Sequence, residues 1–262
     1  MINKRSFFSA ILAGIAALTL FDRTRADDAV SIKTLAPIHN VVLVHGAYAD
    51  GSCWSEVIAR LQKAGIKVTA VQNPLSSLAD DVAATRRILE LQDGPTILVG
   101  HSWAGTVISE VGIDPKVAGL VYVAARAPDA GEDYAALAAR FPTPPASAGL
   151  VKSNGFAQLN EEAFLRDFAG DIDPVKAKVM YAEQGRIADT LFASRTIQAA
   201  WKTKPTWYAV SANDRTTSPE LERFLAKRMK AKTIELPSSH LSMLSHPDEI
   251  TKLILEAAGQ PN

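Results

Sequence analysis

The residues with the clearest chemical potential form the segment Gly100–Ala104, which reads Gly-His-Ser-Trp-Ala. It directly follows the apolar run Pro95–Val99 and opens a segment with helical spacing. A serine in such a tight strand-to-helix turn projects its hydroxyl above the sheet, and the turn leaves room only for small neighbours. Ala104 stands where glycine is usual, and Gly105 follows at once. The sequence therefore predicts Ser102 as a nucleophile.

A serine hydroxyl needs a neighbouring base to take its proton, and histidine is the usual base. His240 follows the last expected strand through a Pro-Ser-Ser segment, in a loop at the carboxyl edge of the sheet, and we predict it as that base. The other four histidines have positions that indicate structural roles: His39 at a strand start, His45 in the loop after the first strand, His101 inside the turn, and His246 before Pro247 at a helix start.

A third group must hold the imidazole in the correct tautomer and offset the charge that it gains. Asp214 ends the run Tyr208–Asp214, at the expected carboxyl end of a strand, and we predict it as the acid. Asp129, which follows the strand that ends near Ala125, is the alternative.

Attack by the serine would create an oxyanion, and each N–H donor that binds it contributes about 3–4 kcal/mol to the barrier. We expect the amides of Trp103, next after the nucleophile, and of Ala47, in the loop after the first strand, as these donors. Gly46 lets that loop turn back over the site. Gly46, Tyr48 and the Trp103 side chain are candidate pocket residues. The alternative is a glycine turn with no part in catalysis.

Short β-branched runs alternate with segments of helical period, which favours an α/β fold with a mostly parallel sheet covered by helices on both faces. The expected strands are 40–44, 66–71, 95–99, 117–124, 205–211 and 232–236. The expected helices are 53–64, 77–91, 103–112, 217–230 and 247–258. At 262 residues, we expect one domain with one core.

The stretch of about 127–195 interrupts this alternation and is mostly helical in pattern. Its size and place between two strands predict a cap over the carboxyl edge of the sheet. Aromatic and large apolar residues of this region either line a pocket or pack the cap on the core: Phe156, Phe164, Phe168, Met180, Tyr181, Phe192 and, beyond it, Trp201. Asp171 and Asp173 lack a clustered third ligand, which indicates a solvated turn and no metal site.

The first 26 residues resemble a secretory signal peptide, so we expect a mature domain of residues 27–262 in the periplasm or outside the cell. Lys4 and Arg5 precede the apolar run Phe7–Phe21, and a small-residue cleavage candidate ends at Ala26. The run is shorter than the roughly 20 residues that span a bilayer, so we expect no stable membrane association after cleavage. The start also resembles a twin-arginine signal, although the paired arginines are absent.

The whole chain balances 28 basic against 28 acidic residues, and the mature part would hold 24 against 27. That balance offers no basic stripe to neutralise phosphates, so we expect no nucleic-acid partner. The single cysteine, Cys53, cannot form an internal disulfide, and we expect it to be a small buried apolar residue.

Three parts of the sequence resemble a known family: the serine turn Gly100–Gly105, called the elbow below, the segment Val44–Trp54, and the later Asp214 and His240. They resemble the branch of the α/β-hydrolase superfamily that contains plant methylesterases and hydroxynitrile lyases, and especially its bacterial esterase relatives. The order of serine, aspartate and histidine is the one typical of α/β-hydrolases. The resemblance covers most of residues 40–258. It implies the same nucleophile, acid, base and oxyanion amides, and no metal or organic cofactor.

Lyases of that branch resemble one another in having a lysine after the base histidine, where this chain has Leu241. Ala47 also stands where a lyase would offer a hydroxyl-bearing residue. We therefore expect hydrolysis of carboxylic esters, small or aromatic, with lactones open to the same chemistry. Three alternatives remain: a ligand-binding protein on this fold without turnover, a cofactor-free perhydrolase, and a hydroxynitrile lyase.

Overall fold

The computed structural model describes residues 37–260, so the expected signal segment lies outside the described residues. A parallel sheet of six strands forms the centre, with the order β2-β1-β3-β4-β8-β9. The strands are β1 (Asn40–Val44), β2 (Lys67–Val71), β3 (Thr96–His101), β4 (Val117–Val123), β8 (Thr206–Ser211) and β9 (Lys232–Leu236). Parallel pairing joins every neighbouring pair in this sheet. The predicted α/β class is confirmed.

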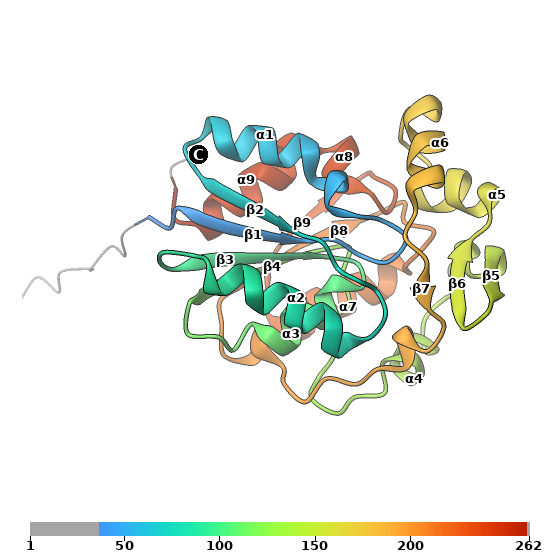
Figure 1. Cartoon of the computed structure of the whole chain (residues 1–262), viewed down its shortest axis with the longest axis horizontal. Coiled ribbons are helices and arrows are strands. Elements are labelled where there is room, and N and C mark those ends of the chain that lie inside the picture. Colours follow the sequence, from blue (N-terminus) through green and yellow to red (C-terminus); the bar gives the residue numbers. More distant parts are fainter. Residues whose placement is uncertain (1–36, 261–262) are drawn as a thin grey trace, which may run out of the picture. The chain divides into compact units, whose positions relative to one another are not determined.

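Helices cover both faces of the sheet (Figure 1). The helices α1 (Ser55–Lys63), α8 (Ser242–Ser245) and α9 (Pro247–Ala257) lie on one face, and α2 (Leu78–Glu90), α3 (Ala104–Val111) and α7 (Pro219–Met229) lie on the other. A short helix η1 (Gly51–Trp54) precedes α1. Every strand and every long helix predicted from the sequence is present, with ends within two residues. The short α8 was not predicted.

The central strands are buried on both faces, because helices cover both. Every residue of β1 and of β3 is buried, whereas the edge strands β2 and β9 keep exposed positions. This is the pattern expected from the continuous apolar runs of the sequence. The loops after the central strands therefore start from rigid backbone.

Local sequence signals fix where the covering helices begin. The side chain of Ser77 accepts a hydrogen bond from the Asp80 amide at the start of α2, and Ser218 caps α7 in the same way. Pro219 and Pro247 occupy the first positions of α7 and α9, where a missing N–H costs nothing. These caps fix where the helices begin and therefore where the preceding loops end.

Between β4 and β8 the chain leaves the sheet and builds an insertion at the carboxyl ends of the strands (Figure 1). We refer to residues 124–205 as the cap. Its elements are α4 (Tyr134–Ala138), η2 (Pro145–Gly149), β5 (Leu150–Ser153), β6 (Phe156–Leu159), α5 (Glu161–Ala163), η3 (Phe164–Phe168), α6 (Pro174–Glu183), β7 (Ile187–Ala188), η4 (Leu191–Ala193) and η5 (Ala200–Lys202). No helix within residues 37–260 has the length and apolar character needed to cross a membrane.

The cap also contains a three-stranded antiparallel sheet, β5-β6-β7, beside the expected helices. Asn154 and Gly155 form the turn between β5 and β6, with φ of 52° and 77°. An Asn-Gly pair with both φ positive is the preferred two-residue hairpin turn, because its twist matches that of the strands. This signal was present in the sequence and was missed there.

Candidate active site

Ser102 lies in a strained turn between β3 and α3. Its φ is 53°, in the left-handed region that residues other than glycine rarely adopt. Three backbone hydrogen bonds hold the turn: the Ser102 amide donates to the Val123 carbonyl at 3.1 Å, and the Ser102 carbonyl accepts from the amides of Gly105 at 3.1 Å and Arg126 at 3.0 Å. The serine is thus fixed to β4 on one side and to α3 on the other.

The glycines around this turn are required by close backbone approach. A Cβ on Gly105 would lie 1.9 Å from the Arg126 carbonyl oxygen, and one on Gly46 would lie 2.7 Å from the Ser102 Cβ. Both distances are below any real Cβ contact. Ala104 carries its Cβ without such a conflict, since it is Gly105 that touches the neighbouring strand loop. This explains why the irregular elbow motif still folds.

The sheet order brings the loops after β1 and β3 together at a crevice. These strands are neighbours, but the chain continues from β1 to α1 on one face and from β3 to α3 on the other. Loops that leave in opposite directions open a crevice at the carboxyl edge, where ligands of open α/β sheets bind. Ala47 follows β1 there, and Trp103 follows β3.

His240 and Asp214 meet at the same edge, in the loops after β9 and β8. The His240 Nδ1 lies 2.5 Å from the Asp214 Oδ2. The other oxygen, Oδ1, accepts from the amides of Thr216 at 2.6 Å and Thr217 at 2.9 Å. The carboxylate therefore accepts the Nδ1 proton and leaves Nε2 with a lone pair. Within residues 37–260 the buried Nε2 has no hydrogen-bond partner.

His101 and Phe168 enclose the His240 ring. The His101 Nε2 donates to the His240 carbonyl at 3.0 Å, and the two ring centroids lie 4.7 Å apart. The Phe168 centroid lies 5.3 Å from the His240 centroid on the cap side. Burial, with the nearby His240 as a second cause, holds the pKa of His101 well below its usual value. His101 is thus a neutral support, in line with its predicted structural role.

His45 shapes the loop that carries Ala47. Its Nε2 accepts from the Asn73 amide at 2.8 Å, so its proton is on Nδ1, which donates to the Gly46 carbonyl at 2.9 Å. The Asn73 side chain donates back to the His45 carbonyl at 3.0 Å. Burial lowers the pKa of His45 and keeps this donor and acceptor pattern intact. The loop is therefore locked by both ring nitrogens of one buried histidine.

The two expected oxyanion amides differ in how their residues are placed. Trp103 is the N-cap of α3, so its N–H precedes the helix's own hydrogen-bond ladder, at the positive end of the helix dipole. Ala47 is buried in the turn after β1. The Trp103 indole is buried and donates to the Asp81 carboxylate at 2.8 Å. The Trp103 side chain does not line the cavity, although the sequence indicated it as a candidate pocket residue.

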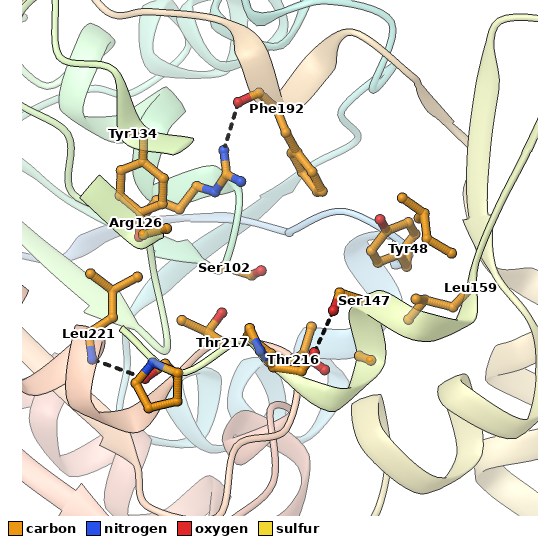
Figure 2. Close-up of a pocket in the computed structure, with 16 residues that line it drawn as sticks. Tyr48, Ser102, Arg126, Tyr134, Ser147, Leu159, Phe192, Thr216, Thr217 and Leu221 are labelled. Carbon is orange, nitrogen blue, oxygen red and sulfur yellow. Dashed lines mark hydrogen bonds between the residues drawn. The ribbon is translucent and has the colours of Figure 1, made fainter. Parts of the chain in front are cut away.

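A cavity of about 260 Å³ opens onto Ser102 (Figure 2). Both the core and the cap contribute to its wall. It is lined by Tyr48, Ser102, Arg126, Tyr134, Ala138, Pro142, Pro144, Ala146, Ser147, Leu150, Leu159, Phe192, Thr216, Thr217, Ser218 and Leu221. Of the two pocket candidates from the sequence, Tyr48 lines this cavity. Gly46 packs against Ser102 and is not part of the lining.

Residues 41–253 match the family model described as the alpha/beta hydrolase family. The chain belongs to this family. An esterase from Nocardioides that hydrolyses carbendazim is 33% identical over 156 residues, which cover 53% of this hydrolase and 61% of that esterase, less than two thirds of its length. A pyrethroid hydrolase from Sphingobium wenxiniae is 24% identical over 256 residues, covering 86% of this chain and 89% of the relative.

A methylesterase from Arabidopsis shares the fold of this hydrolase, with a TM-score of 0.68 and 20% identity over 84% of this chain and 98% of that chain. The resemblance to the branch with plant methylesterases and bacterial esterases is thus confirmed. The two relatives and the solved structure described above are named as hydrolases or esterases.

The aromatic residues of the cap divide between the two expected roles. Phe192 lines the cavity, and Phe168 packs on His240 and on Tyr48. Phe156 is 41% exposed, and the indole of Trp201 is buried against the Pro128 carbonyl at 2.8 Å. The sequence could not separate these roles, because both require the same residue types. Met180, Tyr181 and Phe164 pack within the cap and against the core.

The alternative site residues of the hydrolase have other partners. Asp129 pairs with the ammonium of Lys202 at 2.6 Å, away from His240. His246 occupies the N-cap of α9 without a side-chain cap, and its Nδ1 lies 3.9 Å from the Glu249 carboxylate. Burial raises the pKa of the Cys53 thiol, which is 2% exposed. The described part of the chain holds no cluster of three metal-ligating side chains.

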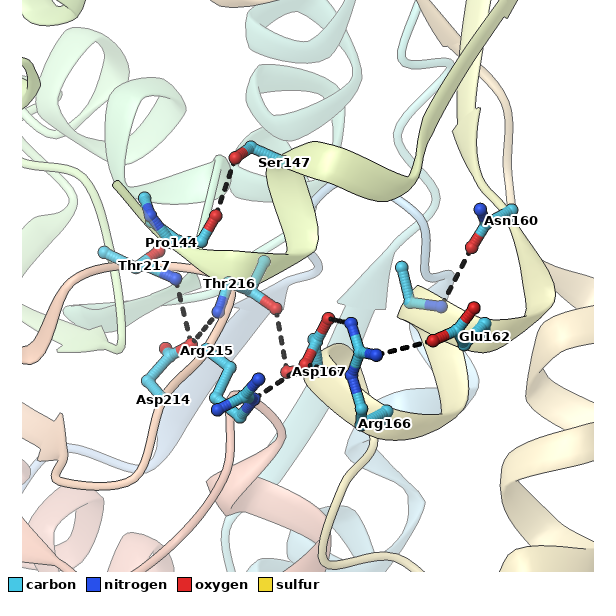
Figure 3. A network of polar contacts seen from close by, with 11 residues as sticks. Pro144, Ser147, Asn160, Glu162, Arg166, Asp167, Asp214, Arg215, Thr216 and Thr217 are labelled. Carbon is cyan, nitrogen blue, oxygen red and sulfur yellow. Dashed lines mark hydrogen bonds and ion pairs between the residues drawn. The ribbon is translucent and has the colours of Figure 1, made fainter. Parts of the chain in front are cut away.

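Two acids tie the cap of this hydrolase to the loops of the predicted acid and base. Asp167 is fully buried and accepts from Arg166 at 2.7 Å and from Arg215, the neighbour of Asp214, at 2.7 Å (Figure 3). Asp171 accepts from the Ser239 amide at 2.8 Å and from its hydroxyl. Asp171 is exposed in a turn, as the sequence indicated, and it also holds Ser239, the residue before His240.

A further buried acid, Glu222 on α7, lies behind Asp214. One of its oxygens accepts from the Ser211 amide at 2.9 Å, and no part of it is exposed. Burial, with the neighbouring Asp214 as a second cause, raises the pKa of Glu222 well above its usual value. Burial thus favours the neutral form of Glu222, whose other oxygen, Oε1, has no hydrogen-bond partner among the described residues. The sequence gave no signal for it, because helical spacing alone does not reveal a buried acid.

Proposed function

We propose that the protein is a serine esterase that cleaves carboxylic esters through an acyl-enzyme on Ser102. The observation that carries this proposal is the hydrogen-bonded pair of His240 and Asp214, with Nε2 unpartnered, at the sheet edge where Ser102 occupies a left-handed turn. The pair lies beside this turn, because His101 donates to the His240 carbonyl. Membership of the family and the esterase names of relatives support the reaction class.

In the proposed mechanism, His240 takes the proton of Ser102 as its oxygen attacks the ester carbonyl. Asp214 stabilises the imidazolium that forms and keeps Nε2 aimed at the reacting atoms. The amides of Trp103 and Ala47 bind the developing oxyanion, each contributing about 3–4 kcal/mol. His240 returns the proton to the departing alcohol. Water then attacks the acyl-enzyme with His240 again as base, which releases the acid and restores Ser102.

The cavity indicates the size and character of the ester. At about 260 Å³ it accommodates a small substrate, and Tyr48, Leu159, Phe192 and Leu221 give it apolar walls. Two relatives are named for the hydrolysis of carbendazim and of pyrethroids, which supports a small-molecule substrate. We propose short-chain or aromatic esters as the substrate class.

The direct test is hydrolysis of 4-nitrophenyl acetate and butyrate by the purified protein. Ser102→Ala is expected to lower kcat by about 10⁴-fold or more, because the nucleophile is lost. Ser52→Ala, at an exposed serine of η1, is the matched control and should leave the rate unchanged. Equal rates for Ser102→Ala and the unsubstituted protein would overturn the mechanism.

The same assay separates turnover from ligand binding without turnover. A serine-directed phosphonate should label Ser102 once per chain and abolish steady-state hydrolysis. A burst of nitrophenol followed by no turnover on any ester would favour the ligand-binding alternative instead.

For location, we propose export with cleavage after residue 26, on the sequence pattern alone. N-terminal sequencing of protein recovered from the periplasm or the medium of an expressing bacterium tests this. An intact N-terminus in the cytosolic fraction would contradict it.

A further inference from the structure

The cavity contains one charged side chain beside the nucleophile. Arg126 follows β4, and its amide donates to the Ser102 carbonyl at 3.0 Å. Its guanidinium lies between Tyr134 and Phe192 on the wall that Ser102 shares (Figure 2). Among the sixteen described residues that line the cavity, it is the only one with a charge. No motif or spacing in the sequence distinguishes this arginine from the others.

No acid among the described residues pairs with this cation. Within residues 37–260, Arg126 takes part in no ion pair, and its one side-chain hydrogen bond is a long contact of 3.4 Å to the Phe192 carbonyl. Burial lowers the pKa of Arg126, and the groups that act against this effect are the hydroxyls of Tyr134 and Tyr48 rather than carboxylates. The guanidinium therefore keeps N–H donors that the described protein groups do not use.

Aromatic rings hold the guanidinium in place. Its central carbon lies 4.2 Å from the ring centroid of Phe192, 4.6 Å from that of Tyr134 and 5.5 Å from that of Trp103. Aromatic rings attract a cation through their faces, but they do not accept hydrogen bonds from the N–H groups that point outward in the guanidinium plane. The charge is thus oriented and left free to bind a planar anion through two N–H groups.

A second polar group at this wall also lacks a partner. Tyr134 is 6% exposed, lines the cavity, and its hydroxyl oxygen has no hydrogen-bond partner among the described residues. A buried hydroxyl without a partner is unfavourable, so such a group in a pocket points to a ligand that completes it. Arg126 and Tyr134 together supply donors of the kind that a carboxylate accepts.

Another arginine of the chain, Arg228, is an example of an arginine that packs on aromatic rings in a purely structural role. Arg228 also lies against two aromatic rings, at 5.4 Å from Trp201 and 5.6 Å from Phe224. However, it pairs with the Glu132 carboxylate at 2.7 Å and donates to the Ala127 carbonyl. A packed arginine here has its acid partner, and Arg126 does not.

We propose that the cavity selects esters that carry a carboxylate in the same molecule, such as monoesters of short dicarboxylic acids, and that Arg126 and Tyr134 bind this carboxylate. This proposal rests on the esterase function proposed above. With a monoester, Ser102 attacks the ester carbonyl, the alcohol leaves with the proton from His240, and water releases the acyl group as a free dicarboxylate.

The test compares the mono-4-nitrophenyl ester of glutaric acid with the neutral ester in which its free carboxylate is methylated. A second pair, 4-carboxyphenyl butyrate and its methyl-capped form, places the charge on the alcohol side. We expect a preference in kcat/KM of at least about tenfold for the anionic member of one pair, expressed mainly in KM. Raising the salt concentration should reduce this preference only in part, because the guanidinium of Arg126 is partly buried.

Arg126→Met, which keeps the packing on the rings and removes the charge, should lower the preference at least tenfold, and Arg126→Lys should retain part of it. Arg186→Met is the matched control. Arg186 lies 5.6 Å from the Phe156 ring on the cap surface, outside the cavity lining, so its loss should leave the preference unchanged. Tyr134→Phe should lower the preference by a smaller factor.

The outcomes separate this proposal from the esterase proposal. Equal rates on the charged and neutral members of both pairs would overturn carboxylate selection and leave the esterase function standing. If neither ester were cleaved, calorimetric titration with glutarate would still decide, since binding is expected in the unsubstituted protein and not in Arg126→Met. If that variant failed to fold, absence of competitive inhibition of the unsubstituted protein by glutarate would overturn the proposal.

Discussion

The edge of the sheet and the cap hold their residues by different means. At the sheet edge, Gly46 and Gly105 allow backbone approaches that no other residue permits, and buried hydrogen bonds fix His45, Asp214 and His240. The contacts that tie the cap to this edge include those of two acids, Asp167 and Asp171. Both arginines that bind Asp167 are about half exposed.

This difference separates the proposed chemistry from the proposed specificity. The predicted nucleophile and acid stand on loops that follow the inner strands β3 and β8, and the predicted base stands on the loop after the edge strand β9. The cavity wall comes largely from the cap, whose contacts with the sheet edge include charged groups that reach solvent. Substitutions at the edge should therefore damage the reaction or the fold, whereas those in the cap should change substrate binding first.

The largest effect is expected for Asp214→Asn. The amide cannot accept and balance the Nδ1 proton as the carboxylate does, so kcat should fall by roughly 10³- to 10⁴-fold with little change in KM. Asp129→Asn is the control, because Asp129 pairs with Lys202 and should leave kcat unchanged. Steady-state kinetics on a nitrophenyl ester measure both. The reverse pattern would assign the acid role to Asp129.

Gly105→Ala should unfold the elbow more than a glycine change in the cap. Its Cβ would meet the Arg126 carbonyl oxygen at 1.9 Å, a backbone conflict worth about 3 kcal/mol of stability. Gly155→Ala, in the cap hairpin, meets no atom within 4 Å and carries only the cost of a φ of +77°, about 1 kcal/mol. Urea unfolding of both variants gives the comparison. Equal losses would contradict the contrast between the two regions.

Asp167→Asn should loosen the cap with a modest cost of about 1 kcal/mol, because both arginine partners are half exposed and solvent screens them. The cap should then be cut several-fold faster by a protease. The Arg166 contact, with Arg215 as a further cause, lowers the pKa of Asp167. Its contribution to stability is present above its unfolded pKa of about 3.9 and is lost as the pH falls through the lower folded value.

The control for this variant is Glu162→Gln. Glu162 binds the same Arg166 but its side chain is 75% exposed, so cap cleavage should stay at the original rate. An equal acceleration by both substitutions would show that the buried position of Asp167 carries no special weight.

The smallest effect concerns Glu222→Gln and depends on pH. Since the folded pKa of Glu222 is raised, the folded state keeps a proton that the unfolded state loses above about pH 4.5. The contribution of this group to stability is therefore full below that pH and declines as the pH rises toward the folded pKa. The amide of the variant does not titrate. Unfolding curves measured from pH 5 to 8 should therefore show the free energy of unfolding of the variant rising relative to that of the unsubstituted protein as the pH rises.

Much of the core fold could be predicted because its signals are local. Continuous apolar runs such as Val41–Val44 indicated strands buried on both faces, and Pro247 marked the start of the last helix. The order of Ser102, Asp214 and His240 on strand ends was enough to predict a common edge. The structure brings Asp214 and His240 into contact, while their catalytic roles and those of Ala47 and Trp103 remain predictions for the kinetics above.

What could not be predicted depends on contacts between distant segments. Arg126 and Tyr134 are ordinary residues in the sequence, and only the folded path of the chain after β4 brings them into contact at the cavity. Asp171 is a turn acid until Ser239, 68 residues away in the chain, donates to it. The hairpin at Asn154 and Gly155 differs, since its Asn-Gly signal was local and available.

The contact between Asp171 and Ser239 has a consequence for engineering. Exchange of the cap for one from a relative is a natural route to new substrate preference, but the segment from Asp167 to Asp171 also orients the loop just before His240. A chimaera that replaces this segment would shift the histidine along with the pocket. A graft limited to β5 and β6, which touch neither loop by a side-chain hydrogen bond in the described residues, leaves the histidine where it is.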